Sequence, residues 1–173
     1  MQVSLVDHNY VAAVWGQVAP LLEKSIHTAH GRYTMEDILR EIVNFEQHLW
    51  VVFDDDKKII AALTTRFINY PRKRILAGQF LGGERIMRWR DDMLDTLENW
   101  ARDNHCHGVE MTGRRGFEKV LSSHGWTPEY TVFEKMFEEK DNGLRRRRRD
   151  TTPTKDRVHS HADKPACICA ALL

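Results

Sequence analysis

The sequence has few cysteines and no long apolar run. Three cysteines in 173 residues are too few for the disulfide framework of a small secreted domain, so we expect a reducing, cytoplasmic environment. The longest apolar runs fall far short of the roughly 20 residues that cross a bilayer, so no membrane contact is expected. The N-terminus also lacks a basic stretch followed by an apolar one, which argues against a secretory signal.

The net charge of +1 conceals an uneven distribution of charge. Residues 140–173 hold nine Lys or Arg and four Asp, a formal charge of +5. The remaining residues hold 17 basic and 21 acidic side chains, a formal charge of −4. A neutral total therefore combines a mildly acidic body with a basic end, and it does not exclude a polyanionic partner.

The basic end differs from the body in composition as well as in charge. Large aliphatic side chains are scarce from Asn142-Gly143 almost to the end, so the segment cannot bury enough apolar surface to offset its ordering entropy. We therefore divide the chain into a folded domain, residues 1–139, and a disordered basic tail, residues 140–173.

A run of five arginines is the sharpest charge feature of this tail. One interpretation is salt-sensitive contact with DNA or another polyanion, and the other is a solvated linker that repels itself. The second is favoured because five arginines bind weakly at physiological salt, and no aromatic residue is interleaved for base stacking. The run consists of Arg145, Arg146, Arg147, Arg148 and Arg149.

Hydrophobic periodicity predicts an alternation of strands and helices in residues 1–139. The order indicates an α/β (α+β) fold with a mixed sheet and helices on both faces. The expected strands cover residues 1–6, 49–53, 59–68, 75–81, 109–112 and 129–137, and the expected helices cover residues 11–22, 34–44, 88–103 and 115–123.

Local signals mark several ends of these elements. Thr34 and Asp37 have the spacing of a capping box. Pro20 predicts a kink or a division in the first helix. Gly82-Gly83 is expected to end the strand at 75–81, and Gly125 to end the last helix.

The element order and several short motifs resemble the GCN5-related N-acetyltransferase (GNAT) superfamily, over roughly residues 1–137. Within it, the chain is most similar to small GNAT-like proteins encoded by bacteriophages. The motifs that carry the resemblance are Gly82-Gly83-Glu84, Trp100-Ala101, Gly113-Arg114-Arg115-Gly116-Phe117, Leu121, His124-Gly125-Trp126 and Phe133-Glu134-Lys135.

The resemblance implies a specific chemistry, the transfer of an acyl group from acyl-CoA to an amine. GNAT proteins hold the acyl carbonyl on backbone N–H groups of a splayed strand. A Gln/Arg-x-x-Gly-x-Gly/Ala loop before a helix holds the pyrophosphate. A Tyr on the penultimate helix usually protonates the departing thiolate, often with a Glu as base.

The loop motif matches this sequence in part, at Gln79 and Gly82. It departs from the pattern at Glu84, whose carboxylate would repel a pyrophosphate unless Arg85, Arg88 or Arg90 offset it. The residues that the resemblance assigns to cofactor binding are Gln79, Phe80, Leu81, Gly82, Gly83, Glu84 and Arg85.

The catalytic tyrosine has no counterpart, because Leu121 stands at its position. Ser122 and His124 are the candidate acids that follow, and Glu110 is the candidate general base.

Two functions stay open on this basis. The first is a degenerate, phage-type N-acyltransferase that uses acetyl-CoA and an unknown amine acceptor. The second is a non-catalytic phage accessory or virion-associated protein, with a GNAT-shaped scaffold and a tail that contacts DNA or a neighbouring subunit. Either would act in the host cytoplasm, and the second also in the virion.

Two groups of histidine and cysteine contain residue types that bind metals, but their spacing is unsuitable and no metal is expected. His105-Cys106-His107 are adjacent, and adjacent residues seldom all reach one ion. The tail holds His-x-His and Cys-x-Cys, gaps narrower than those of structural zinc sites. These tail residues are His159, His161, Cys167 and Cys169.

Overall fold

The computed structural model describes residues 1–113 and 116–137. Residues Met1–Glu129 form one compact unit, and residues 130–137 belong to a second. The expected tail, residues 140–173, with its arginine run and its histidines and cysteines, lies outside the described residues.

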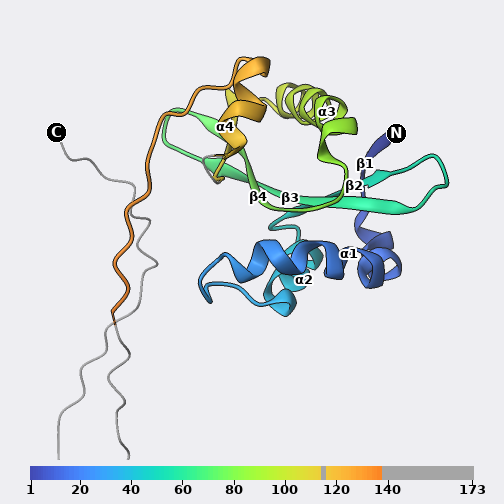
Figure 1. Ribbon diagram of the computed structural model, residues 1–173. Coiled ribbons are helices and arrows are strands. Elements are labelled where there is room, and N and C mark those ends of the chain that lie inside the picture. The colour runs from blue at the N-terminus through green and yellow to red at the C-terminus, as the bar shows by residue number, and fades with distance from the viewer. Residues whose placement is uncertain (114–115, 138–173) are drawn as a thin grey trace, which may run out of the picture. The chain divides into compact units, whose positions relative to one another are not determined.

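A mixed sheet of five strands forms the centre of the first unit (Figure 1). The strands lie in chain order across the sheet, and all neighbours are antiparallel except β4 and β5, which are parallel. The strands are β1 (Gln2–Leu5), β2 (His48–Phe53), β3 (Ile59–Asn69), β4 (Arg74–Gly83) and β5 (Gly108–Met111).

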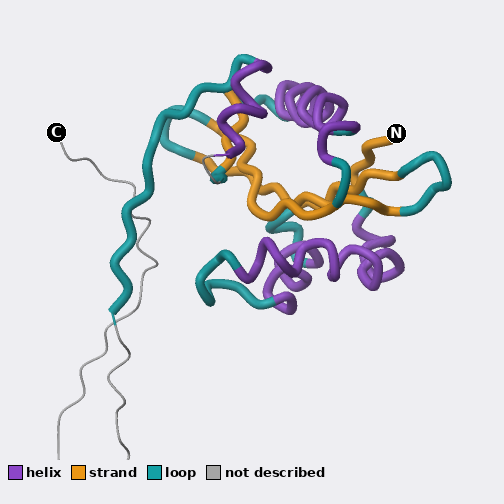
Figure 2. Tube along the Cα trace, viewed as in Figure 1, coloured by secondary structure: helices purple, strands orange, loops and turns teal. Residues whose placement is uncertain are grey.

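Helices cover both faces of this sheet, which confirms the predicted fold class (Figure 2). On one face lie α1 (Val11–His27) and α2 (Met35–Val43), and on the other α3 (Arg90–Asp103) and α4 (Gly116–Leu121). No helix in the described part of the chain is long and apolar enough to cross a bilayer. Short 3-10 turns are η1 (His8–Tyr10), η2 (Ile86–Arg88) and η3 (Ser122–His124).

The apolar run of β2 serves both faces of the sheet. Leu49 and Val51 pack in the cluster formed with α1 and α2, whereas Trp50 and Val52 pack in the cluster formed with α3. Successive side chains of a strand point to opposite faces, so a strand covered on both sides is apolar throughout. The buried Trp50 donates its indole N–H to Thr65 Oγ1 at 2.9 Å, which satisfies its polar atom.

Two predicted helix signals are confirmed in detail. Asp37 N–H donates to Thr34 Oγ1 at 3.2 Å, and Thr34 N–H donates to Asp37 Oδ2 at 2.9 Å, which together form the capping box of α2. Gly125 has φ +77° directly after η3, a conformation that glycine adopts without steric cost. The expected division at Pro20 is absent, since α1 continues through it.

The prediction of a last strand at 129–137 is wrong. Residues 127–137 contain neither helix nor strand, and Tyr130 is 93%, Phe133 92% and Phe137 83% exposed. A strand needs a neighbour for its backbone groups, and this segment pairs with none of the described strands. Its residue types suit a strand, but residue type alone does not supply the partner.

Candidate functional site

A β-bulge in β4 marks the region that the resemblance assigns to acyl-CoA. Thr65 pairs with Gly78 and Thr64 with Phe80, so Gln79 has no partner residue in β3. The parallel pairing of β4 with β5 covers residues 75–78 and 108–111 and then stops. β5 ends at Met111, and β4 continues beyond it to Gly83.

One backbone N–H of β4 beyond the bulge already has a partner on α1. The N–H of Leu81 donates to Ser25 Oγ at 3.3 Å. A Cβ on Gly82 would overlap the carbonyl oxygen of Leu21, so the absence of a side chain at Gly82 lets α1 approach this closely. One of the N–H groups past the bulge is thereby satisfied within the protein.

The space between β4, β5, α3 and α4 is filled by apolar side chains. The cavity that is left has a volume of about 30 Å³, room for no more than a few water molecules. Met111 covers Gly78, because a Cβ there would lie 2.9 Å from Met111 Cγ. The cavity is lined by Leu63, Leu81, Ile86, Trp89, Arg90, Met93, Leu94, Met111, Phe117, Val120 and Leu121.

The expected cofactor loop lies largely within a strand. Gln79 to Gly83 belong to β4, and the strand ends at the predicted glycine pair, Gly82-Gly83, which is itself part of the strand. Both glycines still pair with β3: Gly82 lies opposite Ala62, and Gly83 lies opposite Ala61. Close packing against α1 and Ala61 is the physical reason for both glycines.

Glu84 and Arg85 connect β4 to η2. The N–H of Glu84 donates to Ile60 O at 3.0 Å, and its carbonyl accepts the indole N–H of Trp89 at 2.7 Å. Arg85 has φ +55°, in the left-handed region that non-glycine residues rarely occupy. The connection is therefore a tight turn whose first amide is already hydrogen-bonded.

Asp91 and Asp92 place two carboxylates in the first turn of α3. Negative side chains are favourable there because the helix dipole is positive at its N-terminus. The hydrogen bond from Arg90 lowers the pKa of Asp91 below its usual 3.8, and His124 contributes to the same shift. A helix end of this kind offers a pyrophosphate a less positive field than a glycine loop does.

His124 reaches α3 from η3. Its Nε2 lies 3.0 Å from Asp91 Oδ1, and its Nδ1 lies 3.0 Å from Ser123 Oγ. Nearby, Trp126 Nε1 donates to Glu98 Oε1 at 3.3 Å, a second polar contact with α3. The sequence did not predict this contact of Asp91 with His124. The contact joins elements that are distant in sequence, so no local sequence pattern predicts it.

The proposed acid and base lie on opposite faces of the sheet. Val109 and Met111 pack in the α3-side cluster, so the intervening Glu110 points to the α1 and α2 face. His124 contacts α3, on the other face. Ser122 is exposed in η3. Leu121 lines the apolar cavity, and its hydrocarbon side chain cannot act as an acid.

The His105-Cys106-His107 segment takes part in the turn before β5. His107 Nδ1 accepts the N–H of Arg74 at 3.3 Å, and burial raises the pKa of the Cys106 thiol. Within residues 1–113 and 116–137, no three His, Cys, Asp or Glu side chains are grouped as metal ligands would be.

Searches with family profiles and against curated protein sequences find no match. Solved structures do match. A probable acetyltransferase is 14% identical with a TM-score of 0.60, over 82% of this chain and 99% of that one. Glucosamine-6-phosphate N-acetyltransferase from Arabidopsis thaliana is 13% identical with a TM-score of 0.58, over 79% and 98%.

A predicted acetyltransferase from Clostridium acetobutylicum, solved with acetyl-CoA, is 14% identical with a TM-score of 0.57, over 78% of this chain and 95% of that one. Identities this low establish the fold and nothing finer. The chain has the fold of the GNAT acetyltransferases.

Proposed function

We propose that this protein uses the GNAT fold as a binding scaffold and does not transfer acyl groups from acyl-CoA. Together with the resemblance to GNAT-like proteins of bacteriophages, this makes it a non-catalytic accessory or virion-associated protein of a bacteriophage. The observation that carries the proposal is the small apolar cavity between the sheet, α3 and α4, which has a volume of only about 30 Å³.

An acyl-CoA arm would have to displace several packed apolar side chains. Met111 lies over Gly78, and Phe117 and Leu121 line the same cavity from α4. Moving a large apolar side chain from a fully buried position into water costs about 1.5–3 kcal/mol. These side chains are partly buried, so each costs less, but the costs add and oppose binding.

The charges near the β4–α3 connection also oppose a pyrophosphate. Glu84, Asp91 and Asp92 place three carboxylates around the connection and the first turn of α3. Arg90 is already paired with Asp91. The arginines that remain, Arg85 and Arg88, balance the other carboxylates and leave no excess positive charge for a phosphate.

A second candidate is the degenerate acyl-CoA-dependent N-acyltransferase, which one observation favours. β4 has its bulge at Gln79 and leaves β5 just before it, an arrangement suited to a bound acyl group. In that case residues 79–85 would bind the cofactor, Glu110 would be the base, and Ser122 or His124 the acid. The side chains in the cavity would have to rotate first.

Thermal unfolding with acetyl-CoA separates the two candidates. The scaffold proposal expects the same melting temperature with and without millimolar acetyl-CoA. Met111→Ala, which removes the side chain over Gly78, serves as the comparison variant. A rise in melting temperature that depends on the acetyl-CoA concentration in the native protein would overturn the scaffold proposal and support the second candidate.

A further inference from the structure

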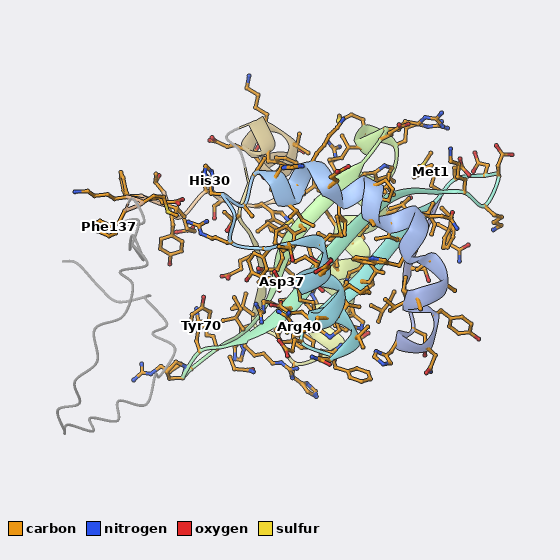
Figure 3. The ribbon with its side chains drawn as sticks, turned by 90° about the horizontal axis from the view of Figure 1, so that it is seen from below. Met1, His30, Asp37, Arg40, Tyr70 and Phe137 are labelled. Atoms are coloured by element: carbon orange, nitrogen blue, oxygen red, sulfur yellow. The ribbon has the colours of Figure 1, made fainter. Side chains whose placement is uncertain are left out.

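We propose that the tip of the β3–β4 hairpin, residues 70–73, binds an acidic segment of a protein partner. Arg72 and Lys73 are exposed at this tip, and Arg74 follows them as the first residue of β4. In Figure 3 Tyr70 marks the tip, at the opposite end of the sheet from Met1. Three consecutive cations at a projecting end of the sheet favour an anionic partner.

This tip is separate from the region that the resemblance assigns to acyl-CoA. β4 runs for ten residues from Arg74 to Gly83. At about 3.3 Å per residue, roughly 30 Å of strand separate the tip from the connection at Glu84 and Arg85. Binding at the tip is therefore independent of whether acyl-CoA binds.

The tip has a fixed shape. The N–H of Tyr70 donates to Lys73 O at 2.8 Å, which closes the turn around Pro71 and Arg72. The ring of Pro71 restricts its own φ to about −65°. A turn fixed in this way loses little backbone conformational entropy when a partner binds.

Arg74 is anchored to the turn that precedes β5. Its Nη1 donates to Asn104 O at 3.2 Å, and its guanidinium lies over the Phe67 ring, 3.9 Å from the centroid. Its backbone N–H donates to His107 Nδ1 at 3.3 Å, and its carbonyl accepts the N–H of His107 at 2.7 Å. Because Nδ1 accepts, the ring proton of the exposed His107 lies on Nε2, where it can donate to another acceptor. Two segments distant in sequence thus present donors at the same end of the sheet.

No carboxylate pairs with the three cations in the part of the chain that the structure describes. Arg72, Lys73 and Arg74 take part in none of its ion pairs. Residues 66–74 hold four basic side chains and no acidic one, whereas the rest of residues 1–139 holds 13 basic and 21 acidic side chains. The adjoining residues 102–109 add one carboxylate, that of Asp103 at the end of α3. The tip is therefore a positive site on a domain that is otherwise negative.

A protein segment fits this tip better than a nucleic acid does. Three cations release too few counterions to hold a duplex firmly at physiological salt. A duplex is also long and negative throughout, so it would extend from the tip along a domain that repels it. A protein segment can be acidic only where it meets the tip. The neighbouring strand β5 pairs only with β4 among the described strands, so its other edge offers N–H and C=O groups to an extended peptide.

A residue-resolved NMR titration of the full chain with octaglutamate tests the proposal. We expect saturable shifts of the backbone amides in residues 70–74 and 104–111, with one dissociation constant for both segments. The amides of residues 140–173 report separately on binding at the tail. Arg72→Gln combined with Lys73→Gln should raise the constant at least fivefold at 20 mM salt, because it removes two of the three cations. Both side chains are exposed, so this variant should fold.

Lys57→Gln combined with Lys58→Gln is the matched control. It makes the same change of net charge in another exposed turn, between β2 and β3, where three aspartates precede the lysines. The control should change the constant less than twofold. A short DNA duplex, titrated at the same concentration of negative charge, tests the other class of partner. Tighter binding of the duplex than of octaglutamate at residues 70–74, no shift of these amides at 10 mM octaglutamate, or equal effects of the two double variants would overturn the proposal.

Discussion

Met111 and Gly78 share one space at the end of the β4–β5 pairing. The two residues are partners in the parallel register, and a Cβ on Gly78 would lie 2.9 Å from Met111 Cγ. The side chain of β5 thus occupies the volume that glycine leaves open on β4. The Met111 side chain therefore lies over the last residue of β4 that pairs with β5.

Gly78→Ala should destabilise the protein by about 1–2 kcal/mol, because the new methyl group crowds Met111. In a Met111→Ala background the same change should cost much less. A double-mutant cycle measured by urea unfolding gives this coupling directly. The same cost for Gly78→Ala in both backgrounds would show that Met111 does not fill this space.

His48 should make the stability of the protein sensitive to mild acid. Burial lowers the pKa of this imidazole below its usual 6.5, so the folded state favours the neutral form. The unfolded chain then binds more protons, and the free energy of unfolding falls as the pH drops from about 6.5 through the folded pKa. A variant that lacks this imidazole isolates the effect.

His48→Phe keeps an aromatic ring against Phe67 and Trp100 and removes the titration. Chemical unfolding between pH 7.5 and 4.5 should show a smaller loss of stability in this variant than in the native protein. His124→Asn is the comparison, because that histidine lies at the surface contact with Asp91. Equal slopes in native protein and His48→Phe would contradict the assignment.

Leu121→Tyr should not create acyltransferase activity. The substitution restores the hydroxyl that the resemblance expects, but Glu84 remains beside the connection to α3 and Met111 still covers Gly78. Release of thiol from acetyl-CoA with a panel of primary amines measures this. Turnover above the uncatalysed rate in Leu121→Tyr would show that the missing acid was the sole obstacle.

A further prediction concerns the basic tail and rests on its amino-acid sequence alone. If residues 145–149 contact DNA, affinity should fall as salt rises, with a log–log slope of about −4.5 for five neutralised phosphates. Deletion of residues 140–173 should remove both the binding and the slope. Binding that survives this deletion would exclude the tail as the DNA contact.

Local signals in the sequence predicted much of the fold. The capping box at Thr34 and Asp37 and the helix end at Gly125 involve neighbours in sequence, so their residue types determine them. The double-sided burial of β2 is likewise visible in its continuous apolar run.

Contacts between elements that are distant in sequence could not be predicted from local patterns. Gly82-Gly83 were expected to end the strand, but the sequence did not show that these glycines also admit α1 and Ala61 at close range. Residues 129–137 have strand-like composition, but they pair with no described strand. The pair formed by Asp91 and His124 likewise joins α3 to η3, and no spacing rule connects them.

The most direct test of the scaffold proposal is a calorimetric titration of the native protein with acetyl-CoA. The small apolar cavity between the sheet, α3 and α4 predicts no heat of binding up to millimolar ligand at neutral pH. A saturable, one-to-one heat of binding that desulfo-CoA competes away would contradict it, because it would show that the cleft opens and accepts the cofactor.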